Sequence, residues 1–341
     1  MQHTQQCIDL LMDESLIENI AVRVGRHDRI LLDICQSKSG TVDQHTLFDM
    51  ASVSKILAVT SLALIALDQG LIGLGDPAAR FFRCDSGMEP ITIKHLMTHT
   101  IGVGHKPLNR PENTCDNIAE YILRIPPDIP VGSDVLYSCP AFILLGKIIE
   151  KVFGKPLNIL AAEMVFAPLA MNSTGYRPKE RTNIVNSNTD SSMLGVVNDY
   201  NCRHLGGVAG NAGIFSNISD LTAFARMLLS RGSPLFSEEI FKTARQNHTA
   251  GMSEARGLGY VYVDERCPQT GSLFPTGSIG HCGHTGQSVF VHPESGLYAI
   301  ILSDATLSTV KKYGHEDYGR VMQMRAELHN AIKADLDEIP G

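Results

Sequence analysis

The sequence feature that most constrains this chain is a serine and a lysine three residues apart, Ser52 and Lys55, at the predicted start of a long apolar helix. Residues 56–67 are almost entirely apolar and Gly70 follows, which predicts a helix of about four turns, buried nearly all round and ended by a glycine cap. Both side chains then share one face of the first turn. The backbone N–H groups of a helix start favour an anionic oxygen, and a desolvated lysine loses its proton more easily. Ser52 is therefore the predicted nucleophile.

A Ser-x-x-Lys pattern arises by chance in many proteins, so the functional interpretation depends on the residues around it. Residues 46–55 read Thr-Leu-Phe-Asp-Met-Ala-Ser-Val-Ser-Lys, and residues 69–77 read Gln-Gly-Leu-Ile-Gly-Leu-Gly-Asp-Pro. These segments resemble the serine β-lactamase and penicillin-binding-protein superfamily, and within it the class C-like branch, which also holds esterases and D-amino-acid peptidases. The resemblance runs from about residue 18 to residue 305, and three motifs in order carry it.

The resemblance implies an α/β fold in which an antiparallel sheet is flanked by helices and a mostly helical lobe is inserted. Residues 1–70 and 250–341 are expected to form the α/β lobe and residues 71–249 the helical lobe, with the active site in the cleft between them. Periodicity predicts a hairpin and a C-terminal strand pair, and it predicts helices at both ends of the chain. The expected strands are 20–24, 30–34, 289–291 and 298–302, and the expected helices include 5–18, 142–150, 219–229 and 318–336.

Length, charge and cysteine usage exclude several classes of protein. A chain of 341 residues exceeds the usual single-domain size, so two lobes are expected. A net charge of −7 argues against a general binder of nucleic acid or anionic membrane and suits small neutral or zwitterionic substrates. We see no secretory signal and no apolar stretch long enough to span a bilayer. The eight cysteines lack paired spacings, so a reducing cytoplasm with free thiols is expected.

The second motif is Tyr137, in a loop just before the predicted helix 142–150. The superfamily places a Tyr-x-Asn or Tyr-Ser-Asp sequence at such a junction, and Tyr137 matches its first position. Cys139 does not match the third, where the family's residue hydrogen-bonds the lysine or a substrate amide, and a thiol is a much weaker partner. The departure bears on efficiency and substrate class more than on the reaction type.

The third motif has two candidate registers within residues 280–286, His281-Cys282-Gly283 and His284-Thr285-Gly286. Simple motif matching favours the second, whereas the spacing to the strand that ends near His292 favours the first, which we prefer. His281, Cys282 and Gly283 then form one wall of the site with Cys139 as substrate-binding residues. In that register the backbone N–H of His284 joins that of Ser52 in the oxyanion hole.

Metal binding is the alternative interpretation of several of these residues. His95 and His99 lie four residues apart, but no third ligand is evident. Cys139 and Cys282 could meet at a zinc ion with neighbouring histidines, or form a disulfide, although a strand directs His281 and Cys282 to opposite faces. The glycine-rich segment 205–216 lacks a phosphate-cradling spacing and indicates close backbone packing near the site. No metal or cofactor is expected.

The predicted function is that of a serine hydrolase that forms a covalent acyl-enzyme on a small-molecule ester, amide or β-lactam. Lys55 and Tyr137 share the transfer of the Ser52 proton, which requires burial and the lysine charge to lower their effective pKa values. A largely neutral histidine at His281 receives a carboxylate poorly, which favours esters, or amides without a critical carboxylate. The alternative is a non-catalytic protein that binds β-lactams or peptidoglycan fragments, which Cys139 leaves open. The sequence indicates no oligomeric state.

Overall fold

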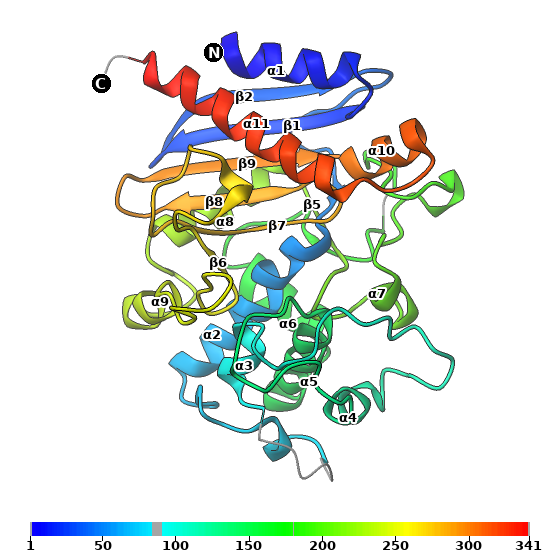
Figure 1. The fold of residues 1–341 in the computed structure, drawn as a ribbon, viewed down its shortest axis with the longest axis vertical. Helices are drawn as coiled ribbons and strands as arrows, with labels where there is room; N and C mark the ends of the chain where they lie inside the picture. Colours follow the sequence, from blue (N-terminus) through cyan, green and yellow to red (C-terminus); the bar gives the residue numbers. More distant parts are fainter. Residues whose placement is uncertain (1, 84–90, 180, 340–341) are drawn as a thin grey trace.

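A six-stranded antiparallel sheet, built from both ends of the chain, crosses the molecule (Figure 1). The computed structural model describes residues 2–83, 91–179 and 181–339. The strand order is β2-β1-β9-β8-β7-β6, and Ile20 on β1 lies opposite Ser303 on β9. The strands are β1 (Asn19–Arg26), β2 (Arg29–Ser37), β6 (Val261–Tyr262), β7 (Ile279–Cys282), β8 (Ser288–His292) and β9 (Leu297–Ser303). The predicted hairpin and C-terminal strand pair are confirmed.

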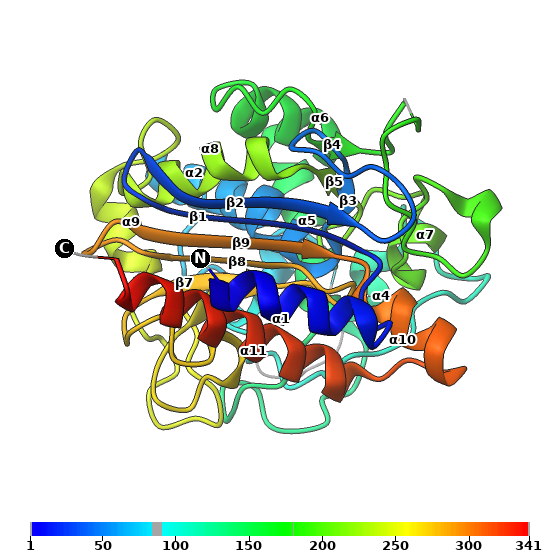
Figure 2. The same ribbon diagram turned by 90° about the horizontal axis from the view of Figure 1, so that it is seen from above.

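Two terminal helices, α1 (Gln2–Asp13) and α11 (Tyr318–Asp337), lie side by side on one face of this sheet (Figure 2). Their apolar stripes share one buried cluster with the strands, in which Leu11 and Leu328 are examples. The predicted helix 5–18 has the wrong bounds, because the chain leaves the helix at Asp13 and Ser15 turns it with a φ of 55°. Leu16 is still buried, so the apolar spacing reflected packing beyond the end of the helix.

The opposite face of the sheet carries α8 (Ile218–Leu229) and, beneath it, the helical part of the molecule. A three-stranded sheet of order β3-β5-β4 lies at the junction. The remaining strands and α-helices are β3 (Phe48–Asp49), β4 (Gly175–Tyr176), β5 (Ile214–Ser216), α2 (Ser61–Asp68), α3 (Ile93–Met97), α4 (Ile118–Leu123), α5 (Cys139–Phe153), α6 (Leu157–Ala161), α7 (Tyr200–His204), α9 (Glu238–Ala244) and α10 (Ala305–Tyr313). The expected fold class, an antiparallel sheet flanked by helices, is therefore confirmed. The lobe boundaries remain a prediction.

The predicted nucleophile helix is continuous from Ala51 to Asp68 but changes character along its length. It begins with a tight turn at Ala51–Val53, continues with wide π-helical turns at Lys55–Thr60 and ends as α2, after which Gly70 has a φ of 67°. It is long and apolar enough to pass for a membrane span, contrary to our expectation, but most of it is buried inside the protein. Its apolar residues belong to the larger core cluster.

A buried histidine between α11 and the sheet predicts a loss of stability in acid. His329 packs edge-on against Phe274 and Phe290, and burial lowers its pKa from 6.5 to about 4. The unfolded chain therefore takes up this proton first, so the stabilising contribution is complete above pH 6.5 and is lost as the pH falls toward 4.

We expect the free energy of unfolding to fall by about 2 to 3 kcal/mol more in the wild type than in His329→Leu between pH 6.5 and 4.5. Urea denaturation at several pH values measures the difference. Equal pH slopes in the two proteins would show that the His329 imidazole titrates normally in the fold.

Candidate active site

A cavity of about 850 Å³ lies where the end of β7 meets the start of the nucleophile helix and the loop before α5. Ser52, Tyr137 and His281 line it together with Cys139. These residues come from the three segments that sequence analysis singled out, which are far apart along the chain. The cavity is thus the place where the predicted motifs meet.

A strained turn presents Ser52 to this cavity. The preceding residue, Ala51, has a φ of 44°, a left-handed conformation that is unfavourable for a residue with a Cβ atom. The Ala51 N–H donates to the buried carboxylate of Asp49 at 2.9 Å, and the other oxygen of that carboxylate accepts from the Asn198 N–H at 2.7 Å. Asp49 therefore holds the turn in place from behind.

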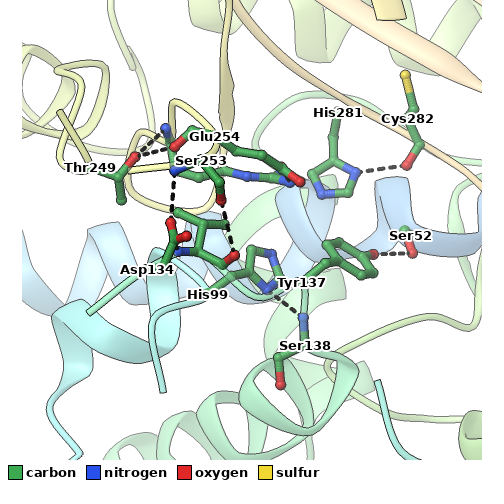
Figure 3. A network of polar contacts seen from close by, with 12 residues as sticks. Ser52, His99, Asp134, Tyr137, Ser138, Thr249, Ser253, Glu254, His281 and Cys282 are labelled. Carbon is green, nitrogen blue, oxygen red and sulfur yellow. Dashed lines mark hydrogen bonds and ion pairs between the residues drawn. The ribbon is translucent and has the colours of Figure 1, made fainter. Parts of the chain in front are cut away.

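The structure brings the three predicted catalytic side chains together. The Tyr137 hydroxyl donates to Ser52 Oγ at 2.6 Å (Figure 3), and Lys55 Nζ donates to the same oxygen at 3.0 Å. Lys55 is fully buried, and its Nζ also donates to the backbone oxygen of Asn211 at 2.9 Å. Ser52 Oγ thus lies between two groups that can exchange protons with it.

The loop that carries Tyr137 is held by His99, a residue whose role sequence analysis missed. The two rings stack with centroids 4.6 Å apart, and His99 Nδ1 accepts from the Ser138 N–H at 3.0 Å. Burial, followed by the charges of Arg256 and Lys55, lowers the pKa of His99 well below its usual value, so the ring is neutral. His95 instead lies at the start of α3, where its Nδ1 accepts from a backbone N–H. The two histidines considered as a metal pair therefore have separate structural roles.

Cys139 is the first residue of α5 and lies beside the lysine, with its Sγ 3.8 Å from Lys55 Nζ. Burial raises the pKa of the Cys139 thiol. The Lys55 charge and a hydrogen bond with His105 lower this pKa by more than burial raises it, so the net shift is downward. Burial alone would lower the pKa of Lys55, yet the anionic forms of Cys139 and Tyr137 raise it overall. Burial raises the pKa of Tyr137 despite the lysine charge.

The resting site therefore differs from the expected one, in which both the lysine and the tyrosine had lowered pKa values. The difference arises because Cys139 places a potential negative charge next to Lys55, which favours the ammonium form. Lys55 is a cation that stabilises negative charge on its neighbours, and Tyr137 is the group left to exchange a proton with Ser52.

The glycine-rich segment packs closely behind this lysine, as expected. A Cβ atom added at Gly210 would lie 1.9 Å from the backbone oxygen of Phe142, so only glycine permits this approach to α5. The next residue, Asn211, provides the backbone oxygen that receives Lys55 Nζ. Close packing of the segment thus fixes the lysine.

The preferred register of the third motif, His281-Cys282-Gly283, lies at the end of β7 beside the cavity. His281 lines the cavity, with its ring 6.3 Å from that of Tyr137, whereas Cys282 Sγ lies 3.9 Å from Ser288 Oγ within the cluster beneath the terminal helices. The two side chains of β7 therefore face opposite ways, and Cys139 and Cys282 are both free thiols. Cys282 is nevertheless one of the residues that line the cavity, as predicted for this wall.

The residues of the second register have other partners. Thr285 is buried, and its hydroxyl donates to the backbone oxygen of Asp49 at 2.9 Å. His284 is half-exposed at the rim, paired with Glu316 at 3.1 Å and stacked on Tyr318. These contacts favour His281-Cys282-Gly283 as the substrate-facing register. Both Ser52 and His284, the predicted oxyanion-hole residues, line the same cavity.

Gly283 gives a direct test of how β7 approaches the nucleophile turn. A Cβ atom at this position would lie 2.8 Å from the Met50 backbone oxygen and 3.4 Å from Ala51 Cβ. Gly283→Ala must push the strand away from the turn, and we expect kcat to fall on the order of tenfold, since small displacements of reacting groups slow the chemical step strongly.

Steady-state kinetics on any turned-over ester measures this effect, with circular dichroism to confirm the fold. Gly75→Ala is the matched control, because no atom lies within 4 Å of a Cβ added there. An unchanged kcat in Gly283→Ala would mean that the end of β7 is not part of the catalytic geometry.

Sequence analysis also missed Arg256, which lines the cavity although it is only 4% exposed. Its guanidinium carbon lies 5.8 Å from the centre of the Tyr137 ring. No motif marks this arginine, because its position depends on the loop before β6 folding back onto the loop before α5. Only the contact between these two loops in the folded chain places Arg256 beside Tyr137.

The sheet is antiparallel and carries both terminal helices on one face, and the Ser-x-x-Lys helix begins at the cavity on the other side. This is the architecture of the serine hydrolases of the β-lactamase and penicillin-binding-protein type. The sequence model of the Beta-lactamase family matches residues 4–319. The chain belongs to this family, and it is a serine hydrolase of that type.

Relatives and solved structures agree with this assignment. The chain is 27% identical over 308 residues to an Escherichia coli (strain K12) protein provisionally named D-alanyl-D-alanine carboxypeptidase, covering 78% of this chain and 70% of that protein. It is 26% identical to an N-acetylmuramyl-L-alanine amidase of Bacillus subtilis (strain 168), covering 76% and 68%. In fold it is similar to EstCE1, a hydrolase with promiscuous acyltransferase activity, with a TM-score of 0.78, 19% identity and coverage of 97% and 98%.

Proposed function

We propose that Ser52 attacks the carbonyl carbon of an ester or amide and forms an acyl-enzyme that water then hydrolyses. The observation that carries this proposal is the pair of contacts to Ser52 Oγ, 2.6 Å from the Tyr137 hydroxyl and 3.0 Å from Lys55 Nζ. In the reactive form Tyr137 is a phenolate that the Lys55 ammonium stabilises. The phenolate accepts the serine proton as Oγ attacks, and the resulting phenol donates that proton to the leaving group, which regenerates the phenolate.

The oxyanion of the tetrahedral intermediate is stabilised by the backbone N–H groups of Ser52 and His284. Two observations support this assignment. Both residues line the cavity, and a Cβ atom added at Gly283, the residue before His284, would lie 2.8 Å from the Met50 backbone oxygen at the nucleophile turn. Water activated by the same tyrosine and lysine then attacks the acyl carbon, with the proton moving in the reverse direction.

The proposed substrates are small-molecule esters or amides, including peptidoglycan-type D-amino-acid amides and, with lower efficiency, β-lactams. The named activities of the relatives support an acyl group attached through an amide or ester. Cys139 and a neutral His281 both differ from the asparagine and lysine that favour β-lactam recognition in the superfamily. Simple esters are therefore the first substrates to test.

Intact-mass spectrometry after treatment with a fluorophosphonate, and separately with a penicillin, tests the covalent step. We expect one adduct per chain, and proteolysis should map it to Ser52. Parallel assays with 4-nitrophenyl esters, a chromogenic cephalosporin and a D-alanyl-D-alanine peptide rank the substrates. A penicillin adduct that persists, with no turnover of any of these compounds, would instead identify a binding protein of the same fold.

A further inference from the structure

The active-site cavity contains a second nucleophilic side chain, that of Cys139, which the mechanism above does not use. The residue is only 4% exposed, yet it lines the cavity of about 850 Å³ together with Ser52. A small molecule that enters the cavity therefore meets this thiol. Cys139 is also the first residue of the 15-residue helix α5, and the dipole of a helix favours a negative charge at this end.

The hydrogen-bond partners of the Cys139 sulfur are nitrogen groups. Lys55 Nζ lies 3.8 Å from Sγ and donates to it, and His105 forms a second hydrogen bond with the same sulfur. The other two contacts of this ammonium group go to Ser52 Oγ and to the Asn211 backbone oxygen. An ammonium has three N–H donors, so the third is directed at the sulfur. A sulfur that accepts from an ammonium is suited to be a thiolate.

Two other free cysteines have the opposite surroundings. Cys202 Sγ donates to the Ala212 backbone oxygen at 3.2 Å, and Cys115 Sγ donates to the Leu205 backbone oxygen at 3.2 Å. A sulfur can donate to a carbonyl oxygen only while it keeps its proton. These two side chains are therefore thiols, and a thiol is a much weaker nucleophile than a thiolate.

The direction of the pKa shifts agrees with these contacts. Burial raises the pKa of the Cys7 thiol to about 11. Burial also raises the pKa of Cys139, but the Lys55 charge and the His105 hydrogen bond lower it by more, against a smaller opposing effect of Asp199. The net shift of Cys139 is downward, so its thiolate is more populated than that of an ordinary buried cysteine.

The same cavity offers an acceptor for the O–H group of a small polar molecule. His281 lines the cavity and is 3% exposed, and its Nε2 has no hydrogen-bond partner among the described residues. His281 Nδ1 lies 2.7 Å from the Cys282 backbone oxygen, which places the ring proton on Nδ1 and leaves Nε2 as an acceptor. An unpaired buried acceptor is unfavourable, so this cavity is suited to a ligand that carries an O–H group.

We propose that Cys139 is a modification site at which a small hydroperoxide reversibly oxidises the thiolate to a sulfenic acid and thereby blocks the hydrolase. With hydrogen peroxide, the sulfur attacks one oxygen, an S–O bond forms and the O–O bond breaks. Sulfur loses two electrons and the peroxide is reduced, and the hydroxide that leaves takes a proton from water. A thiol then reverses the change: one molecule gives a mixed disulfide and water, and a second releases the Cys139 thiol and a small disulfide.

Oxidation blocks hydrolysis because it changes a group in direct contact with the catalytic lysine. The sulfenic acid adds an oxygen atom inside the cavity, next to the Lys55 Nζ that lies 3.0 Å from Ser52 Oγ. This oxygen is a new partner for the ammonium and takes up space that an acyl substrate needs. The loss of ester hydrolysis rests on the proposed function, whereas the oxidation of Cys139 itself does not.

Dimedone, which reacts with sulfenic acids, tests the site directly. The protein is treated with hydrogen peroxide in the presence of dimedone, digested and mapped by mass spectrometry. We expect Cys139 to be labelled on the order of tenfold faster than Cys115, an exposed thiol that is not among the residues lining the cavity. Lys55→Met should slow the labelling of Cys139, and Ser52→Ala should not. Labelling confined to Cys115, or to the other cysteine of the cavity, Cys282, would overturn the proposal.

Ester hydrolysis tests the consequence of the modification. Peroxide should lower the rate of the wild type by on the order of tenfold, and dithiothreitol should restore it. Cys139→Ser and Cys139→Ala, each compared with its own untreated rate, should resist peroxide. Cys115→Ser is the matched control and should be inactivated like the wild type. Inactivation that persists in both Cys139 variants, or that dithiothreitol does not reverse, would contradict a reversible block at this residue.

The two measurements separate failure of the modification site from failure of the hydrolase. If fluorophosphonate labels Ser52 and esters are hydrolysed, but dimedone does not label Cys139, only the modification site is wrong. If no ester is hydrolysed and fluorophosphonate does not react, the proposed function is wrong. In that case, the mapping of dimedone still decides whether Cys139 is oxidised.

Discussion

Ser52→Ala should reduce kcat for every hydrolysed ester by on the order of 10⁴-fold or more, the largest effect expected of any single change in this chain. The reason is that the covalent pathway disappears, while the cavity and its binding groups remain. Fluorophosphonate labelling, read by intact mass, should vanish in the same variant.

Ser54→Ala is the matched control for this turn. Ser54 is buried two residues further on, and its hydroxyl oxygen accepts from the Ile214 N–H at 3.1 Å, away from the Tyr137 and Lys55 contacts. It should lose some stability and still form the adduct. Labelling that survives Ser52→Ala, or that maps to Cys139, would refute the nucleophile assignment.

Removal of either proton-transfer partner should produce the second-largest effect. We expect Lys55→Ala and Tyr137→Phe each to slow acylation by on the order of a hundredfold or more, the usual scale for general acid–base groups. Their combined effect should be smaller than the product of the two, because the Lys55 charge acts through the Tyr137 phenolate. Stopped-flow measurement of the acylation burst gives the four rates of the double-mutant cycle.

Tyr176→Phe provides the comparison for a partly buried tyrosine outside the site, since its hydroxyl donates to the Ala209 backbone oxygen at 3.2 Å. That variant should acylate at nearly the wild-type rate. Independent, fully multiplicative effects of Lys55→Ala and Tyr137→Phe would mean that one of the two residues serves only to hold the structure.

The third motif shows why sequence matching alone was ambiguous. His284 and Thr285 match the family's third sequence motif better than His281 and Cys282 do. In the structure, however, the Thr285 hydroxyl hydrogen-bonds the Asp49 backbone oxygen behind the nucleophile turn. His281 lies on a strand that faces the cavity, and His284 lies in the turn that follows it. Spacing to the next strand favours the first register, because strand pairing determines which residues reach the cleft, and the register itself remains a prediction.

The sequence by itself determined those features that depend on short-range spacing and periodicity. The alternation of apolar residues defined the β1–β2 hairpin and the β8–β9 pair, and the distance of three residues placed Lys55 within reach of Ser52. Such relations survive in any fold that preserves the local element, so they can be inferred without tertiary information. The family resemblance then gave the order of the three motifs.

Only the tertiary structure decided the electrostatics of the site and the place of Arg256. The pKa of Lys55 rises rather than falls because Cys139, contributed by α5, lies beside it, and His281 stays neutral because burial, Lys55 and Arg256 all oppose its protonation. Burial and charge act through space, so they depend on which distant segments the fold brings within a few ångströms of one another. No pattern along the chain contains those distances.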